Sequence, residues 1–112
     1  MMTEIDLNEK LNKWIPILHL ENWTIIIKYV SLKSSWGECD YEPPAYSATI
    51  SLRPLTDKRW LKAVRDPETI LVHELLHVVL VQFKIFELNP DEDKEEDIVN
   101  YLTKLLIAME RK

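Results

Sequence analysis

The chain has 112 residues, of which 46% are hydrophobic and 29% are charged, values that fit one globular domain and exclude a disordered or collagen-like chain. Acidic residues outnumber basic residues by 19 to 14, so the formal net charge is -5 and we expect no nucleic-acid partner. The longest uncharged apolar run, residues 75–81, is too short for a bilayer span, and the first residues lack the pattern of a signal peptide. We expect a single cytoplasmic domain over residues 1–112 that has no membrane partner.

Two rare residue types exclude further classes of protein. The single cysteine, Cys39, cannot form an internal disulfide, so stability must come from packing or from a bound metal. The single glycine, Gly37, excludes the glycine-rich loops that bind phosphates and dinucleotides.

The first half of the chain predicts one helix and three strands. Apolar residues at helical spacing predict the helix, with Thr3 or Asp6 as its cap, and β-branched, aromatic or alternating residues predict the strands. The expected bounds are 5–18 for the helix and 23–30, 34–40 and 46–52 for the strands. The residues expected to face the core are Ile5, Leu11, Ile15 and Leu18 in the helix and Tyr46, Ala48, Ile50 and Leu52 in the third strand.

The second half predicts two helices after a polar loop. Asp66 is a suitable N-cap and Pro67 a suitable first residue for a helix whose residues 70–83 are apolar on almost every side, as in a buried helix. A last helix with acidic first turns is expected from residues 89–91 to about Met109. Its expected core residues are Ile98, Leu102, Leu105 and Met109. The predicted fold is α+β: an N-terminal helix, a small twisted sheet of about three strands, the buried helix and the acidic helix.

The buried helix contains His73-Glu74-Leu75-Leu76-His77, which matches the HExxH pattern of zinc sites. The two histidines lie one helical turn apart, so they project from one face and can bind one ion. Glu74 is rotated by about 100° around the helix and can approach a metal-bound water without being a ligand. Burying three unpaired ionisable groups among leucine and valine costs free energy, and a divalent metal would offset this cost.

A catalytic zinc ion needs a third protein ligand and an open position for water. We expect Glu96 in this role, because Asn100 follows it one turn later and can hydrogen-bond a ligating imidazole. The other candidates for this position are Glu92, Glu95, His19 and Cys39. Apart from Glu96, the acidic residues at the start of the last helix are expected to be solvated.

HExxH on one helix and Glu96-x-x-x-Asn100 on the next resemble the gluzincin zinc metallopeptidases, the thermolysin-like group, with Asn100 where those enzymes have aspartate. The small size, the strands WTIII and YSATI and the helical C-terminal end are most similar to the minigluzincins, the soluble minimal scaffolds of this kind. The resemblance covers about residues 11–109. It implies a minimal gluzincin-like zincin fold with one zinc ion per chain, held by His73, His77 and Glu96.

The resemblance also implies a zinc-dependent endopeptidase that acts on a peptide or protein substrate. Glu74 would take a proton from the metal-bound water that attacks the peptide bond. The third strand would pair with an extended substrate through its backbone. The candidates for stabilising the oxyanion are Tyr41, Tyr46, Tyr101 and His19, and the sequence does not choose among them.

Two other interpretations remain open. In a non-enzymatic interaction module, zinc would only stabilise a small core, but such a site has four protein ligands and does not need Glu74. A peptidase dedicated to one regulatory protein would be similar to the repressor-cleaving metallopeptidases, which usually accompany a DNA-binding helix-turn-helix region that this chain has no room for.

The sequence also favours self-inhibition. Strand 46–52 is expected to be exposed and able to pair with any extended segment, and residues 102–109 are apolar on more than one helix face. We therefore expect homo-oligomers, dimers or larger, and a specific activity that falls as the protein concentration rises.

Overall fold

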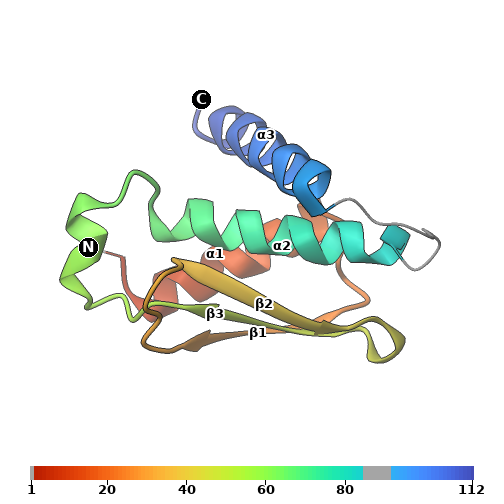
Figure 1. Ribbon diagram of the computed structural model, residues 1–112, viewed down its shortest axis with the longest axis horizontal. Helices are drawn as coiled ribbons and strands as arrows, with labels where there is room; N and C mark the ends of the chain where they lie inside the picture. The colour runs from red at the N-terminus through yellow and green to blue at the C-terminus, as the bar shows by residue number, and fades with distance from the viewer. Residues whose placement is uncertain (1, 85–91) are drawn as a thin grey trace.

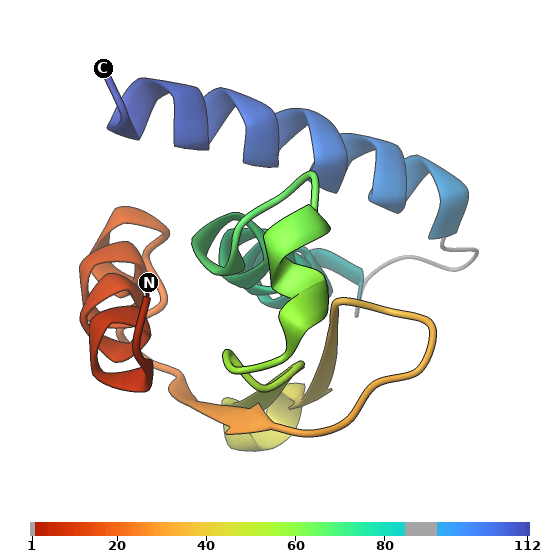
Figure 2. The ribbon, with the colours of Figure 1, turned by 90° about the vertical axis from the view of Figure 1, so that its left-hand side faces the viewer.

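The computed structural model describes residues 2–84 and 92–112, which form three helices and a three-stranded sheet (Figure 1). The helices are α1 (Glu4–Ile17), α2 (Pro67–Lys84) and α3 (Glu92–Glu110). The strands are β1 (Thr24–Tyr29), β2 (Gly37–Glu42) and β3 (Ser47–Leu52), and the short 3-10 helices are η1 (Pro43–Ala45) and η2 (Lys58–Lys62). Helix α2 lies between the sheet and α3, with α1 beside it (Figure 2). The predicted α+β class is confirmed, and the predicted helix start at residues 89–91 lies outside the described residues.

Helix α1 begins with a capping box in which both predicted caps take part. The Thr3 hydroxyl accepts a hydrogen bond from the Asp6 backbone N–H at 3.1 Å, and the Asp6 carboxylate accepts one from the Thr3 backbone N–H at 2.9 Å. The buried residues of α1 are Leu7, Leu11 and Trp14. The prediction that Ile5 faces the core is wrong. Ile5 is 73% exposed, because it lies about 200° around the helix from Leu7.

Strand β3 lies in the middle of the sheet, in the order β1-β3-β2. It pairs in parallel with β1, where Thr24 is opposite Ser47, and antiparallel with β2, where Gly37 is opposite Leu52. The prediction of an exposed strand at residues 46–52 is therefore wrong, because neighbouring strands occupy both edges of β3. Strand β2 is an edge of this sheet instead, and it contacts α2.

The inner face of β3 follows the predicted alternation except at its start. Ala48, Ile50 and Leu52 are buried. Tyr46 was expected to join them, but it has a positive φ of 48°, which takes it out of the strand geometry. Its ring is 50% exposed and lies edge-on to Trp23, with 5.5 Å between the ring centroids.

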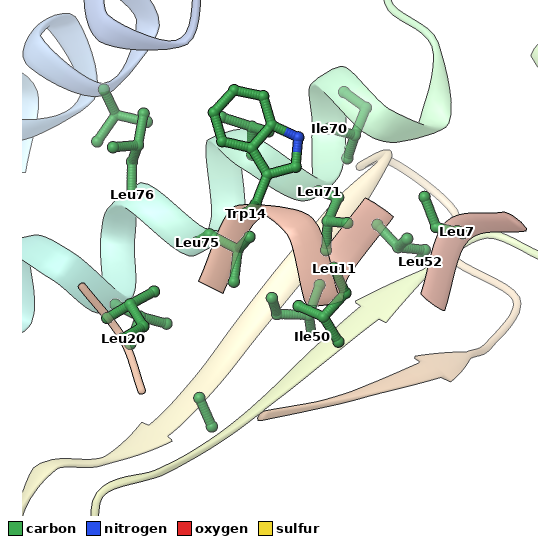
Figure 3. Close-up of a cluster of buried hydrophobic side chains, with 14 of the residues drawn as sticks. Leu7, Leu11, Trp14, Leu20, Ile50, Leu52, Ile70, Leu71, Leu75 and Leu76 are labelled. Atoms are coloured by element: carbon green, nitrogen blue, oxygen red, sulfur yellow. The ribbon is translucent and has the colours of Figure 1, made fainter. Parts of the chain in front are cut away.

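The core fills the space between the sheet, α1 and α2 (Figure 3). Leu71 and Leu75 of α2, Leu11 of α1, and Ile50 and Leu52 of β3 converge there, and all five side chains are buried. Burial of each such side chain contributes about 1.5–3 kcal/mol. This contact fixes which side of α2 faces the sheet.

Helix α2 is enclosed on every side. The Asp66 carboxylate accepts a hydrogen bond from the Thr69 backbone N–H at 2.8 Å, which confirms the predicted N-cap. Every residue from Pro67 to Gln82 is buried or half-buried, as the apolar pattern predicts. Within the described residues, neither α2 nor another helix has the length and apolar character that a membrane span requires.

Helix α3 packs on α2 through a face that differs from the predicted one. Ile98, Leu105 and Met109 were expected in the core but are 48%, 43% and 60% exposed. The buried residues of α3 include Val99, Thr103 and Ile107. The true face is rotated by about 100° from the predicted one, equivalent to one residue. An apolar pattern misses this face because Thr103 is part of it; its hydroxyl donates to the Val99 carbonyl at 2.7 Å.

Glu68, in the first turn of α2, joins three helices through its carboxylate. It is 4% exposed and accepts hydrogen bonds from Trp14 Nε1 at 2.8 Å, Lys13 Nζ at 3.1 Å and Arg111 Nη2 at 3.1 Å. Arg111, just after α3, also pairs with Asp66 at 2.7 Å. Burial alone would raise the pKa of Glu68, but the three hydrogen bonds outweigh it and lower the pKa to about 2.

Replacing Glu68 with glutamine should destabilise the fold, because Lys13 and Arg111 lose their buried anionic partner. We expect the free energy of unfolding at pH 7, measured by urea denaturation, to fall by about 2 kcal/mol. The folded-state pKa of about 2 lies below the ordinary value of 4.5, so the contribution is present above about pH 5 and is lost as the pH falls towards 2. The wild type and the variant should therefore converge in stability at low pH.

The control is Asp57→Asn, which removes an ion pair with Arg59 at the surface. This variant should change the free energy of unfolding little, because surface ion pairs contribute weakly. Equal losses in the two variants would contradict the role given to Glu68.

Candidate metal centre

Helices α2 and α3 bring His73, His77 and Glu96 together. Leu71 and Leu75 hold one side of α2 against the sheet, and the two histidines lie on the other side, towards α3. Glu96 Oε1 lies 2.9 Å from His73 Nε2, and Glu96 Oε2 lies 3.2 Å from His77 Nε2. One ligand atom from each of the three residues lies within 4.8 Å of the others. Within the described part of the chain, no other trio of histidine, cysteine or acidic side chains meets this condition.

This donor set fits a zinc ion. Two imidazoles and a carboxylate are a known ligand set for catalytic zinc, with bonds of about 2.0–2.2 Å, and tetrahedral geometry then places ligand atoms about 3.3–3.5 Å apart. Here the Glu96 carboxylate lies between the two imidazoles, with one oxygen 2.9 Å from His73 Nε2 and the other 3.2 Å from His77 Nε2. The His73 side chain is 12% exposed, and its burial lowers its pKa, which favours the neutral imidazole that binds metals. The Glu96 side chain is 50% exposed, so the group can be reached from solvent.

Glu95 is buried, at 9% exposure, which contradicts the prediction of a solvated side chain. Its Oε1 lies 3.4 Å from His77 Nδ1. When Nε2 of His77 binds a metal, Nδ1–H can donate to Glu95, and this contact orients the ring. Glu95 precedes the buried Val99 by one helical turn and therefore shares the face of α3 that packs on α2. Sequence reasoning missed it because the buried face was placed through Ile98.

Arg65, which no sequence pattern singled out, reaches the site from the loop before α2. Its Nη1 lies 3.4 Å from His73 Nδ1, and its Nη2 donates to Asn100 Oδ1 at 3.2 Å. Asn100 is thus linked to His73 through Arg65, and not by the direct hydrogen bond that we predicted. Since arginine only donates, His73 Nδ1 is the acceptor in this arrangement and Nε2–H donates to Glu96.

Glu74 lies on the flank of the site that faces β2. It is 7% exposed, and burial, assisted by Glu96 and opposed by His77, raises its pKa to about 7. Gly37 makes room beside it, because a Cβ at this position would lie 2.8 Å from Ile70 Cγ2 and 3.4 Å from Glu74 Cγ. The absence of a side chain at Gly37 therefore lets β2 approach α2 next to Glu74.

The other predicted candidates lie outside this cluster. His19 is exposed beyond the end of α1, with a positive φ of 56°. Cys39 is half-buried on β2, and burial, with nearby acidic groups, raises its pKa to about 12, so it remains a thiol and is a poor metal ligand. The side chain of Glu92 lies outside the described part of the structure.

The structure does not choose an oxyanion-stabilising residue among the tyrosines. Tyr46 and Tyr101 are 50% and 67% exposed, and Tyr41 is half-buried on β2. This role stays a prediction.

Comparisons with known proteins identify no relative. No protein-family model matches the chain, and neither the curated proteins nor the solved structures contain a match. The assignment to the minigluzincins therefore stays a prediction that rests on the residues described above.

Zinc affinity should depend strongly on Glu96 and less on Glu95, its neighbour in α3. Glu96→Gln removes a ligand and should weaken binding by about 100-fold or more, whereas Glu95→Gln loses only the contact that orients His77 and should weaken it by about 10-fold. Asp97→Asn is the matched control, because Asp97 is exposed in the same turn and its replacement should leave the affinity unchanged. Competition with a chromogenic chelator measures all three. A larger loss for Glu95→Gln than for Glu96→Gln would identify Glu95 as the ligand.

Proposed function

We propose that the chain is a zinc-dependent endopeptidase of the minigluzincin type. The observation that carries this proposal is the convergence of His73, His77 and Glu96 beside a buried carboxylate, Glu74, that is not one of the three. A structural zinc site is closed by four protein ligands, whereas among the residues that the structure describes this group supplies three, which would leave a position for water or substrate.

The chain's own residues support hydrolysis of a peptide bond. A zinc ion held here would lower the pKa of a water molecule and polarise the substrate carbonyl. Glu74 is the general base, and its pKa of about 7 suits a group that accepts a proton and then releases it to the leaving amine. Glu95 orients His77 for its role as a ligand.

Strand β2 supports the proposal with a place for an extended substrate. It pairs with β3 along one side, and no other strand in the described residues pairs with its second side. Gly37, its first residue, lies against Glu74. The backbone of an extended peptide can pair with such an edge, so we assign to β2 the substrate-binding role that the sequence pattern assigned to residues 46–52.

We also propose that the chain associates with itself. The surface that supports this proposal is on α3, because β3 is paired on both sides and offers no free edge. The exposed apolar residues along the outer side of this helix are Ile98, Tyr101, Leu105 and Met109. Light scattering and specific activity over a dilution series test it. A monomer whose specific activity does not change with concentration would contradict self-inhibition.

Glu74→Gln should keep the fold and the zinc ion but reduce peptide cleavage by about 100-fold or more, because the general base is lost while the ligands remain. Metal analysis and a quenched fluorescent peptide library measure the two properties. Glu9→Gln, at an exposed position on α1, is the control and should cleave like the wild type. Cleavage by Glu74→Gln at the wild-type rate would remove Glu74 from the mechanism. A wild type that binds zinc but cleaves no peptide would favour the non-enzymatic module.

A further inference from the structure

A pocket of about 360 Å³ lies next to the candidate metal centre. The residues that line it are Trp36, Lys62, Ala63, Val64, Arg65 and Ile70. Two of them connect the pocket to the site: Arg65 lies 3.4 Å from His73 Nδ1, and Ile70 borders the space at Gly37 beside Glu74. A group bound in this pocket would therefore lie close to the bond that the proposed peptidase cleaves.

The wall of this pocket is basic, although the chain as a whole has a net charge of -5. The basic residues between β3 and α2 are Arg53, Lys58, Arg59, Lys62 and Arg65. The two acidic residues of the same connection, Asp57 and Asp66, are paired with Arg59 and Arg111. Within the described residues, no ion pair joins Lys62 or Arg65 to a carboxylate. Among the described residues, the pocket therefore presents two cations that are not paired with a carboxylate.

Arg65 has N–H donors that its present hydrogen bonds do not use. The side chain is half-buried, and its two hydrogen-bond contacts are with neutral groups, His73 Nδ1 and Asn100 Oδ1. A guanidinium group carries five N–H donors, so most of them are not used by these contacts. When His73 binds a metal through Nε2, its Nδ1 carries the proton and can no longer accept from Arg65. A metal held by His73 Nε2 would therefore leave this N–H of Arg65 without its acceptor.

Trp36, another lining residue, is held in place by ring contacts. The ring centroids of Trp36 and Trp60 lie 4.7 Å apart, and Arg53 Cζ lies 4.2 Å from the Trp36 centroid. Arg53 is only 5% exposed, so this stack is anchored in the protein. A wall that is fixed before binding lowers the entropic cost of ordering a ligand.

We propose that this pocket binds a carboxylate of the substrate, an inference that rests on the proposed peptidase function. Arg65 and Lys62 supply charge-assisted hydrogen bonds to the carboxylate, and Trp36 and Ile70 contact the carbon atoms that carry it. The carboxylate belongs either to a glutamate or aspartate side chain or to the free C-terminus of a peptide.

Three versions of one fluorescent peptide distinguish these sources. The first peptide has glutamine at every position to be varied and an amidated C-terminus. The second has glutamate at one of these positions at a time. The third has glutamine at all of them and a free C-terminus. Anisotropy titrations use the zinc-loaded Glu74→Gln chain, which binds without cleaving. We expect one of the carboxylate peptides to bind about tenfold more tightly than the neutral peptide, with a difference that shrinks at high salt. Equal affinities for all three would overturn the proposal.

Variants of the basic residues test the assignment to this pocket. Lys62→Gln and Arg65→Gln, each in the Glu74→Gln chain, should reduce the preference for the carboxylate peptide by about threefold or more. Lys58→Gln is the matched control, because Lys58 lies in the same 3-10 helix but lines a different pocket. Lys62→Gln decides the outcome if Arg65→Gln loses zinc through its contact with His73. A preference that survives Lys62→Gln, or that falls equally in Lys58→Gln, would overturn the proposal.

Cleavage by the wild type separates this inference from the proposed function. If neutral and carboxylate peptides are cleaved equally well, the pocket has no such role and the peptidase function stands. If no peptide is cleaved but the carboxylate preference in binding follows Lys62 and Arg65, the pocket is confirmed as a carboxylate site and the peptidase function is wrong.

Discussion

Helix α2 is buried or half-buried from Pro67 to Gln82 and yet carries His73, Glu74 and His77 near its middle. The surroundings of the site depend on how these three groups are satisfied. Burial lowers the pKa of His73 and raises that of Glu74, so the apolar surroundings act on both in the direction of the neutral form. Glu96 reaches across from α3 and gives one oxygen atom to each imidazole of His73 and His77. The contact that satisfies the two imidazoles also brings together three side chains that could hold a metal ion.

Charged contacts fasten α3 to α2 at both of its ends. Near the start of α3, Glu95 and Glu96 meet the two histidines, and just after its end Arg111 meets Asp66 and Glu68. Apolar residues between these ends complete the contact. A metal bound through Glu96 would therefore hold α3 in place, and its binding free energy would add to the stability of the whole domain.

The connection from β3 to α2 and the edge strand β2 form the surroundings of the site. Gly37 lets β2 approach Glu74, and the connection places Arg65 beside His73. Such connecting segments are where specificity commonly resides, because they tolerate change while the helices and strands fix the chemistry. The position of Arg65 and Lys62 in the pocket wall agrees with this division.

The sequence by itself determined the features that depend on neighbouring residues. Asp66 caps α2, Thr3 and Asp6 cap α1, and one helical turn aligns His73 with His77, because helix geometry relates residues a few positions apart. The contact of Glu96 with both histidines was also predicted from helix periodicity, on the expectation that the two helices pack against each other. Tertiary structure alone decided the strand order, the rotation of α3 and the contacts of Glu95 and Arg65. These depend on segments far apart in the chain: Thr103 belongs to the buried face only because of how α3 meets α2, and Arg65 reaches His73 only because the loop after β3 returns to the site.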